Sequence, residues 1–126
     1  MDNALVVLIV DDEQVIRELL TVALEEDGYE ILSAESGEEA IALLDKRKDI
    51  RGVIADVRLG GERKVSGWDV ARRAREMYPD IAVVYMSGDS GVDWTAQGVP
   101  KSVMVVKPFA MSQIATAIAN QLNEAG

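Results

Sequence analysis

The sequence contains no cysteine and no histidine. Without cysteine it forms neither disulfides nor thiolate metal sites, and without histidine it has no imidazole for acid–base catalysis, zinc binding or phosphohistidine chemistry. Any metal that this chain binds must therefore be a hard ion with oxygen ligands. A long hydrophobic run is also missing, since a membrane span needs about 20 apolar residues, and residues 1–3 lack the basic flank of a signal peptide. We expect a cytoplasmic protein with no membrane partner.

Positive charge is scarce as well. The chain has 13 basic residues against 22 acidic ones, so its formal net charge is −9 at pH 7. Because a surface that follows nucleic-acid phosphates needs net positive charge at least locally, we expect no direct binding to nucleic acid. Residues 58–75 are locally basic, which is typical of a solvated helix face and less often of a docking patch for an acidic partner.

Length and hydrophobicity indicate a single domain. The 126 residues, 48% of them hydrophobic, suffice for one core and are too few for a second. The sequence shows no internal repeat, low-complexity segment or interdomain linker. We expect residues 1–126 to form one domain, with no output domain.

The first hydrophobic run, residues 5–10, ends in two adjacent carboxylates, Asp11 and Asp12. Six aliphatic residues without polar alternation are typical of a strand buried on both faces of a parallel sheet. Such a strand places the residues that follow it at the carboxyl edge of the sheet, where ligands bind in open α/β folds. Two interpretations remain open at this point: a cation site, or a solvated Asp11 beside an Asp12 that caps the next helix.

Strands and helices alternate along the rest of the chain. Further strands are predicted at residues 29–34, 52–55, 81–86 and 103–106. Helices are predicted at residues 13–26, 67–78 and 110–123. One more helix is expected to begin at a capping box, residues 36–39, and to end at the basic residues 46–48. The stretch 92–99 is a poor helix former, so a short or irregular element is expected there. Five strands alternating with helices predict a doubly wound parallel sheet of the flavodoxin-like class, with strand order 2-1-3-4-5 and helices on both faces.

Polar residues stand at the ends of four of these strands. Asp11 and Asp12 follow the first, Asp56 the third, Ser87 the fourth and Lys107 the fifth. Each alone has a simple structural explanation as a turn residue, a helix cap or a surface cation. In the order 2-1-3-4-5 the four strands are neighbours, so these side chains are predicted to converge on one pocket.

This set of side chains suits phosphoryl transfer onto an aspartate. Three carboxylates without histidine or cysteine favour Mg²⁺ or Mn²⁺. A carboxylate can attack phosphorus to form an acyl phosphate, while an ammonium and a hydroxyl hold the remaining phosphoryl oxygens.

The pattern resembles the receiver domains of two-component response regulators over essentially the whole chain. The motifs that carry the resemblance are VVLIVDDE (6–13), VIADVRLG (53–60), YMSGDS (85–90) and VVKPFA (105–110). The resemblance implies that Asp56 is the phosphoacceptor, and that Asp12 and Asp56 bind Mg²⁺ directly together with the backbone carbonyl of Arg58. It further implies that Asp11 acts mainly through a metal-bound water.

The resemblance also implies that Ser87 and Lys107 contact the phosphoryl group and that the Lys107–Pro108 peptide bond is cis. The phosphate would come from a histidine kinase, a histidine phosphotransfer protein or a small phosphodonor. Arg58 and Asp89 stand two residues beyond site residues on facing loops, and we hypothesise that they pair across the pocket and limit access of hydrolytic water.

Three features depart from the family pattern. Leu59-Gly60-Gly61 and a longer loop replace the usual Met-Pro pair, Met104 occupies the usual place of a Tyr or Phe, and the fourth helix is weak. In the family that aromatic residue is coupled to the site hydroxyl, and that helix belongs to the signalling face. We therefore expect an intact phosphorylation site with unusual output machinery, in which Met104 modulates switching.

The leading interpretation is a stand-alone phosphorylation switch whose only chemistry is self-phosphorylation and autodephosphorylation, and which acts on an unknown downstream protein or drains phosphate from a kinase. The alternative is a phosphorylation-independent protein-binding module on the same fold, which Met104 and the weak fourth helix favour. A phosphatase with an aspartyl nucleophile would usually carry Asp-x-Asp after its first strand, and Asp11-Asp12-Glu13 does not match that pattern.

Overall fold

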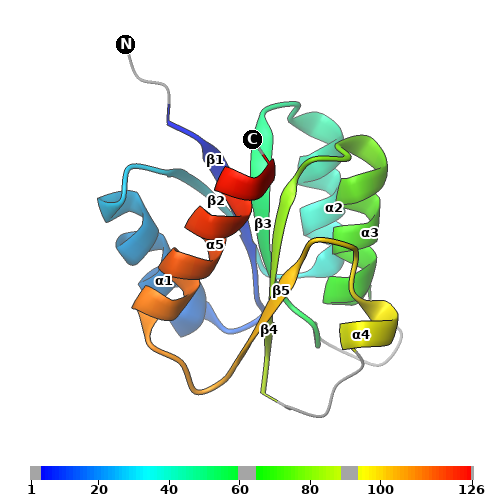
Figure 1. The fold of residues 1–126 in the computed structure, drawn as a ribbon. Helices are drawn as coiled ribbons and strands as arrows, with labels where there is room; N and C mark the ends of the chain where they lie inside the picture. Colours follow the sequence, from blue (N-terminus) through cyan, green and yellow to red (C-terminus); the bar gives the residue numbers. More distant parts are fainter. Residues whose placement is uncertain (1–3, 60–64, 89–93, 126) are drawn as a thin grey trace.

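One parallel sheet with the strand order β2-β1-β3-β4-β5 forms the centre of the computed structural model (Figure 1). The structure describes residues 4–59, 65–88 and 94–125. The strands are β1 (Val6–Val10), β2 (Glu30–Ala34), β3 (Ile50–Asp56), β4 (Ala82–Ser87) and β5 (Val103–Val106). The helices are α1 (Gln14–Glu26), α2 (Gly37–Lys46), α3 (Gly67–Met77), α4 (Trp94–Gln97) and α5 (Met111–Ala125). The predicted fold class and strand order are confirmed.

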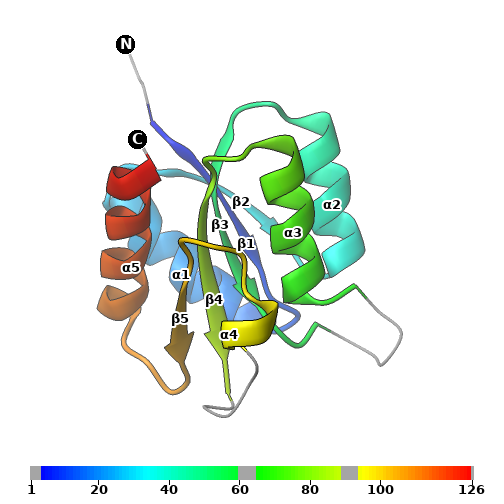
Figure 2. The same cartoon turned by 45° about the vertical axis from the view of Figure 1, so that its right-hand side comes forward.

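The helices cover both faces of the sheet. Helices α1 and α5 lie on one face and α2 and α3 on the other (Figures 1 and 2). All five residues of β1 are buried, and they alternate between the two layers, since side chains of a strand point to opposite faces. Leu8 packs into the core under α2 and α3, whereas Val7 and Ile9 pack with Leu20 of α1 and Ile114 of α5. This double burial explains the unbroken aliphatic run.

Helix α1 is less deeply packed than its sequence suggests. Leu20 and Leu24 are fully buried, but Val15, Leu19 and Val22 are between 49% and 64% exposed. These three positions are four and three residues apart, so they share the solvent side of the helix. This apolar stripe of α1 therefore faces away from the sheet.

Several predicted boundaries shift by one or two residues. Strand β3 begins at Ile50, which is buried and pairs with Val6, so the strand is longer than predicted. Ser87 is the last residue of β4 and does not follow it. Helix α4 has only four residues, which confirms the expectation of a short element. Within the described part of the chain, no helix has the length and apolar character that crossing a membrane requires.

The N-terminus of α3 is fixed by a capping box that the sequence analysis missed. The Ser66 hydroxyl accepts the Asp69 N–H, and the Asp69 carboxylate accepts the Ser66 N–H. At the predicted box of α2, Ser36 accepts the Glu39 N–H, but the Glu39 carboxylate accepts the N–H of Glu35 and not that of Ser36. The α3 box holds the start of this helix next to the end of β3.

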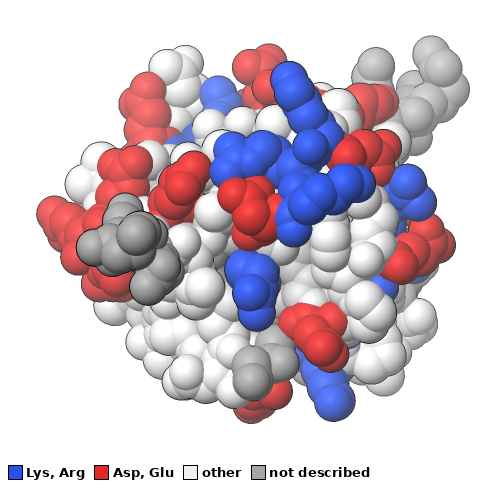
Figure 3. All heavy atoms as spheres, turned by 90° about the horizontal axis from the view of Figure 1, so that it is seen from above, with Lys and Arg blue, Asp and Glu red and all other residues white. Residues whose placement is uncertain are grey.

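Two of the three arginines of α3 pair with neighbouring acidic groups. Arg72 pairs with Asp69, and Arg73 pairs with Asp45 and Glu76. Figure 3 looks onto the end of the molecule where the strands begin, and it shows basic and acidic side chains lying close together there. The pairing favours a charge-balanced helix face over a docking patch for an acidic partner. Residues 60–64 of the basic stretch lie outside the described residues.

Candidate functional site

Three aspartates meet where β1 and β3 end. Carboxylate oxygens of Asp11, Asp12 and Asp56 lie within 4.8 Å of one another. Asp11 is fully buried, Asp56 is 6% exposed and Asp12 is exposed. Strands β1 and β3 are direct neighbours in the sheet, with Val10 opposite Ala55, so the residues that follow each pair come together. The predicted convergence of these three side chains is observed.

Lys107 joins this cluster from the end of β5. Its Nζ lies 2.9 Å from Oδ2 of Asp56, 3.4 Å from Oε1 of Glu13 and 3.6 Å from Oδ2 of Asp11. Burial alone would lower the pKa of Lys107, but the carboxylates of Asp56 and Asp11 outweigh burial and raise the pKa above its ordinary value. Lys107 is therefore an ammonium at neutral pH that balances part of the negative charge.

Asp11 is fully buried, and its two carboxylate oxygens are partnered unequally. Its Oδ1 accepts the Glu13 N–H at 2.8 Å, whereas its buried Oδ2 finds no hydrogen-bond partner among the described residues. Burial raises the pKa of Asp11 from 3.8 to about 6, and the charge of Asp56 adds to the increase. A buried, poorly partnered carboxylate oxygen is costly unless a cation compensates it.

The simpler interpretation of the Asp11-Asp12 pair is wrong. Asp11 is buried and not solvated, and the N-cap residue of α1 is Glu13, so Asp12 does not occupy the capping position. Three clustered carboxylates fit a hard divalent ion such as Mg²⁺, which takes a few protein oxygens and completes its octahedron with water and phosphate. The cation-site interpretation is the one that agrees with this geometry.

Ser87 lies beside the acidic cluster on the neighbouring strand. Asp56 is paired in register with Met86, so Ser87 stands one residue further along β4, and its side chain is buried. The backbone carbonyl of Ser87 accepts the Lys107 N–H at 2.6 Å, which connects the ends of β4 and β5. The Lys107–Pro108 peptide bond is cis, as expected.

The structure describes two of the three predicted modulating residues, Arg58 and Met104. Arg58 donates its backbone N–H to Oδ1 of Asp56 at 3.0 Å, so the main chain after β3 folds back on the acceptor candidate. Met104 lies on β5 opposite Tyr85 and is partly buried against the α2 and α3 side of the core. Asp89 lies outside the described residues, and its pairing with Arg58 stays a prediction.

Sequence reasoning missed two residues that contact the site. Glu13 approaches the Lys107 ammonium, and Arg17 donates to the backbone carbonyl of Asp11 at 2.7 Å. Both are located where α1 begins, and Arg17 is one helix turn beyond Glu13. The sequence feature that could have indicated these contacts is a glutamate directly after two aspartates, followed four residues later by an arginine.

Gly67 allows α3 to begin in direct contact with the acceptor strand. Its N–H donates to the carbonyl of Val57 at 3.2 Å, and a Cβ at this position would overlap the backbone carbonyl of Asp56. Because backbone atoms cannot be moved aside as a flexible side chain can, Gly67→Ala should destabilise the fold by about 2 kcal/mol and displace Asp56. Urea unfolding of the variant measures this loss.

Gly88→Ala is the matched control, since a Cβ at Gly88 meets no atom of the described residues within 4 Å. It should change the free energy of unfolding by less than about 0.5 kcal/mol. A Gly67→Ala variant as stable as Gly88→Ala would contradict the proposed contact.

Comparison with known proteins agrees with this geometry. The pattern of the response regulator receiver domain family matches residues 7–119. This chain belongs to that family. The matched residues include the acidic cluster, Ser87, Lys107 and all of the sheet except Val6.

One solved structure and two curated proteins illustrate the similarity. The solved response regulator receiver protein from Sinorhizobium medicae is 35% identical and superposes with a TM-score of 0.92 over 98% of each chain. The phosphate regulon transcriptional regulatory protein PhoB of Pseudomonas aeruginosa is 34% identical over 95% of this chain and 52% of its own length. The sensor kinase CckA of Brucella abortus is 29% identical over 98% of this chain and 13% of its own length. The chain thus spans about half, or less, of these two curated relatives.

Family membership has consequences for the site. Receiver domains of response regulators are signalling modules of two-component systems, generally without enzymatic activity of their own, and they interact with histidine kinases or phosphotransfer proteins. They bind Mg²⁺ at a cluster of aspartates, and this receiver domain has such a cluster in Asp11, Asp12 and Asp56.

Proposed function

We propose that this receiver domain is a phospho-accepting switch in which Asp56 takes a phosphoryl group from a histidine kinase, a histidine phosphotransfer protein or a small phosphodonor. The observation that carries the proposal is the position of the Asp56 carboxylate, which is nearly buried, 2.9 Å from the Lys107 ammonium and next to Asp11 and Asp12. A phosphoryl group on Asp56 would change which proteins the domain binds.

The chemistry is an in-line transfer between donor and carboxylate. A carboxylate oxygen of Asp56 forms a bond to phosphorus while the P–N bond of the donor phosphohistidine breaks, and the imidazole keeps the electron pair of that bond. The hydrogen bond from the Arg58 N–H to Oδ1 orients the carboxylate, so Oδ2 faces Lys107. Oriented groups of this kind lower the barrier because no reorganisation is needed during the reaction.

Asp12, Asp56 and the backbone carbonyl of Arg58 would hold Mg²⁺ or Mn²⁺ directly, and Asp11 would hold it through a water molecule. When bound, the ion supplies positive charge between the acceptor carboxylate and the incoming phosphoryl oxygens. The buried Oδ2 of Asp11 supports this assignment, because an ion-bound water would provide the hydrogen-bond partner that it lacks among the described residues.

Lys107 and Ser87 would contact the transferred group. The Lys107 ammonium already lies within hydrogen-bond distance of Asp56 and can turn to a phosphoryl oxygen, and Ser87 stands beside it at the end of β4. Arg58 and Asp89 would tune the lifetime of the acyl phosphate by limiting access of water.

Phosphate incorporation should require a divalent metal. We expect the protein, incubated with acetyl phosphate and Mg²⁺, to gain one acid-stable, base-labile phosphoryl group by intact-mass measurement. Removal of the metal with EDTA should slow incorporation about 100-fold or more, since the repulsion between carboxylates and phosphate is then uncompensated. Equal incorporation with and without metal would contradict the assigned role of the aspartate cluster.

A phosphorylation-independent binding module remains the second candidate. Met104 on β5 and the single turn of α4 favour it, because both depart from the usual signalling face of the family. Partner affinity that is the same with and without a bound phosphoryl mimic would support this candidate.

A further inference from the structure

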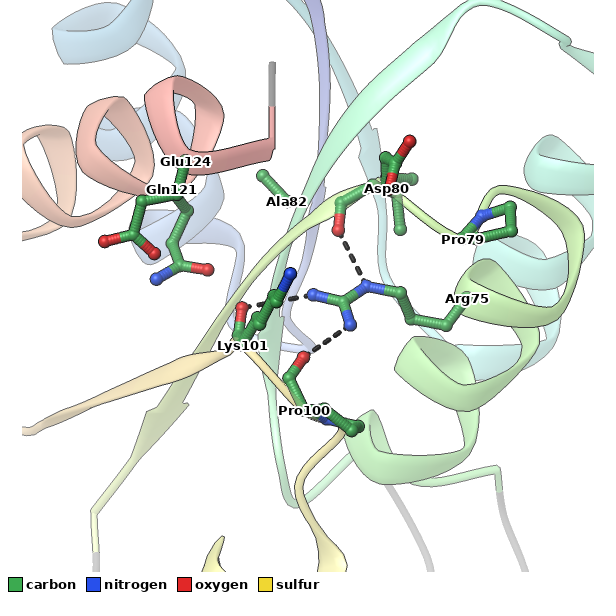
Figure 4. A pocket seen from close by; sticks show the side chains of 9 residues that line it. Arg75, Pro79, Asp80, Ala82, Pro100, Lys101, Gln121 and Glu124 are labelled. Carbon is green, nitrogen blue, oxygen red and sulfur yellow. Dashed lines mark hydrogen bonds between the residues drawn. The ribbon is translucent and has the colours of Figure 1, made fainter.

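A cavity of about 340 Å³ lies at the end of the sheet where the strands begin, opposite the acidic cluster (Figure 4). Its apolar part is formed by Ile81 and Ala82 at the start of β4, which are 3% and 1% exposed. The rest of its lining comes mainly from α3, the turn before β5 and the C-terminal part of α5. These elements contribute Arg75, Pro100, Lys101, Gln121 and Glu124. A volume at the lower end of the range for ligand pockets suits a small molecule of about the size of an amino acid.

Arg75 fixes one wall of this cavity. Its guanidinium donates to the carbonyl of Ile81 at 2.8 Å, to the carbonyl of Lys101 at 3.1 Å and to the carbonyl of Pro100 (Figure 4). These three hydrogen bonds hold the turn before β5 against the residues that lead into β4. The wall is therefore formed by the protein alone, as is usual for ligand pockets.

Lys101 occupies a backbone conformation that favours glycine. Its φ is +59°, in the left-handed region that residues with a Cβ rarely adopt. The contact with Arg75 uses only the carbonyl of Lys101, which a glycine would provide without strain. The Lys101 ammonium forms no ion pair with any carboxylate in the described part of the chain. Because strained residues cluster at functional sites, these observations indicate a role for the side chain itself.

The charges around the cavity come from separate elements. Figure 4 shows Gln121 and Glu124 on the side of α5, and Arg75 and Asp80 on the side of α3. Burial lowers the pKa of Arg75 and the charge of Asp80 opposes this decrease, so Asp80 lies close enough to act on the guanidinium. Glu124, like Lys101, forms no ion pair among the residues that the structure describes. An ammonium and a carboxylate at this cavity are thus both open to a ligand.

We propose that this cavity binds a free α-amino acid with an apolar side chain. The ligand carboxylate accepts a hydrogen bond from the Lys101 ammonium, the ligand ammonium donates to the Glu124 carboxylate, and the apolar side chain packs on Ile81 and Ala82. A simple anion would meet the repulsion of Glu124, and a simple cation that of Lys101, so a ligand with both charges is the best complement. This site is separate from the acidic cluster, because the two lie at opposite ends of the sheet.

Titration of the full chain with L-leucine, followed by the chemical shifts of backbone amides, tests the proposal. We expect changes concentrated in residues 80–82, 100–102 and 121–124, with a Kd of about 1 mM. Two analogues each lack one charge: 4-methylpentanoate has no amine, and 3-methylbutylamine has no carboxylate. Each should bind at least about tenfold more weakly than leucine, because one charge-assisted hydrogen bond is lost.

Charge-removing variants show whether the two assigned groups hold the ligand. Lys101→Gln and Glu124→Gln should each weaken leucine binding at least about tenfold. Lys101→Gln keeps the carbonyl that Arg75 binds, so the wall of the cavity is preserved. Lys46→Gln on α2 and Glu26→Gln on α1 are the matched controls, because they remove the same charges from exposed positions outside the cavity. Both controls should bind leucine like the wild type.

Three results would overturn the proposal. The first is the absence of shift changes around the cavity with leucine at about 50 mM, far above the expected Kd. The second is equal affinity for leucine and 4-methylpentanoate, which would make the cavity a simple anion site. The third is leucine binding by both Lys101→Gln and Glu124→Gln that matches the wild type, since neither assigned group would then hold the ligand.

Discussion

Replacing Asp56 with asparagine is expected to abolish phosphate incorporation. An amide is not nucleophilic enough to attack phosphorus, whereas its shape and its oxygen preserve the acceptor for the Arg58 N–H. With Mg²⁺ and acetyl phosphate, the wild type should gain one base-labile phosphoryl group and Asp56→Asn none, a difference of at least about 100-fold in initial rate. Intact-mass measurement over time gives both rates.

Asp45→Asn is the control for this substitution. Asp45 is an exposed carboxylate that pairs with Arg73 on the surface, so its replacement removes one negative charge without touching the acidic cluster. Its rate of incorporation should equal that of the wild type. Equal labelling of Asp56→Asn and the wild type would show that the phosphate goes to another residue, and the proposed function would then be wrong.

The substitution Asp11→Asn is expected to stabilise the metal-free protein. Burial first, and then the charge of Asp56, raise the pKa of Asp11 from 3.8 to about 6. An increase of the pKa from 3.8 to about 6 corresponds to about 3 kcal/mol of unfavourable free energy for the charged form at pH 8. Asparagine removes that charge and can still accept the Glu13 N–H through Oδ1. Urea unfolding at pH 8 should show a gain of up to about 3 kcal/mol.

The same pKa shift predicts how wild-type stability depends on pH. The folded state binds a proton on Asp11 more tightly than the unfolded state, so this contribution is fully present below pH 3.8 and is lost as the pH rises through about 6. Metal-free wild type should therefore gain stability between pH 8 and pH 5, and Asp11→Asn should gain less. The advantage of the variant over the wild type should shrink accordingly at pH 5.

Two further measurements make the Asp11 prediction specific. Mg²⁺ should stabilise the wild type more than Asp11→Asn, because an ion bound by the folded state alone adds to stability and the variant lacks one carboxylate. Asp45→Asn, which alters only an exposed ion pair, should change stability by less than about 1 kcal/mol. An Asp11→Asn variant less stable than the wild type at pH 8 would contradict the inferred cost of the buried charge.

The fold and the members of the candidate site could be predicted from the sequence. Three features depend only on residues that are close together in the sequence: the uninterrupted aliphatic run of β1, the alternating strand and helix patterns, and the weak α4. The predicted strand order then placed the ends of these strands at one edge of the sheet, since parallel strands end on the same side. The residues at that edge are Asp11, Asp12, Asp56, Ser87 and Lys107.

Contacts between distant residues could not be predicted in this way. The sequence does not show that Glu13 reaches Lys107, 94 residues away, or that Arg17 holds the main chain of Asp11. Nor does it show that Val15, Leu19 and Val22 of α1 face solvent. A helical period tells which residues share a side, but the width of the buried side depends on the neighbouring elements.

By itself the sequence determined the architecture, the acidic composition and the identity of the groups at the carboxyl edge, because these depend on residue type and local order. Only the tertiary structure decided that Asp11 is buried with one poorly partnered oxygen, that Lys107 contacts Asp56, and that the Tyr85 hydroxyl accepts the Val99 N–H. Burial and through-space contacts depend on how separate elements pack in three dimensions, and the energy of a charge or hydrogen bond depends on both.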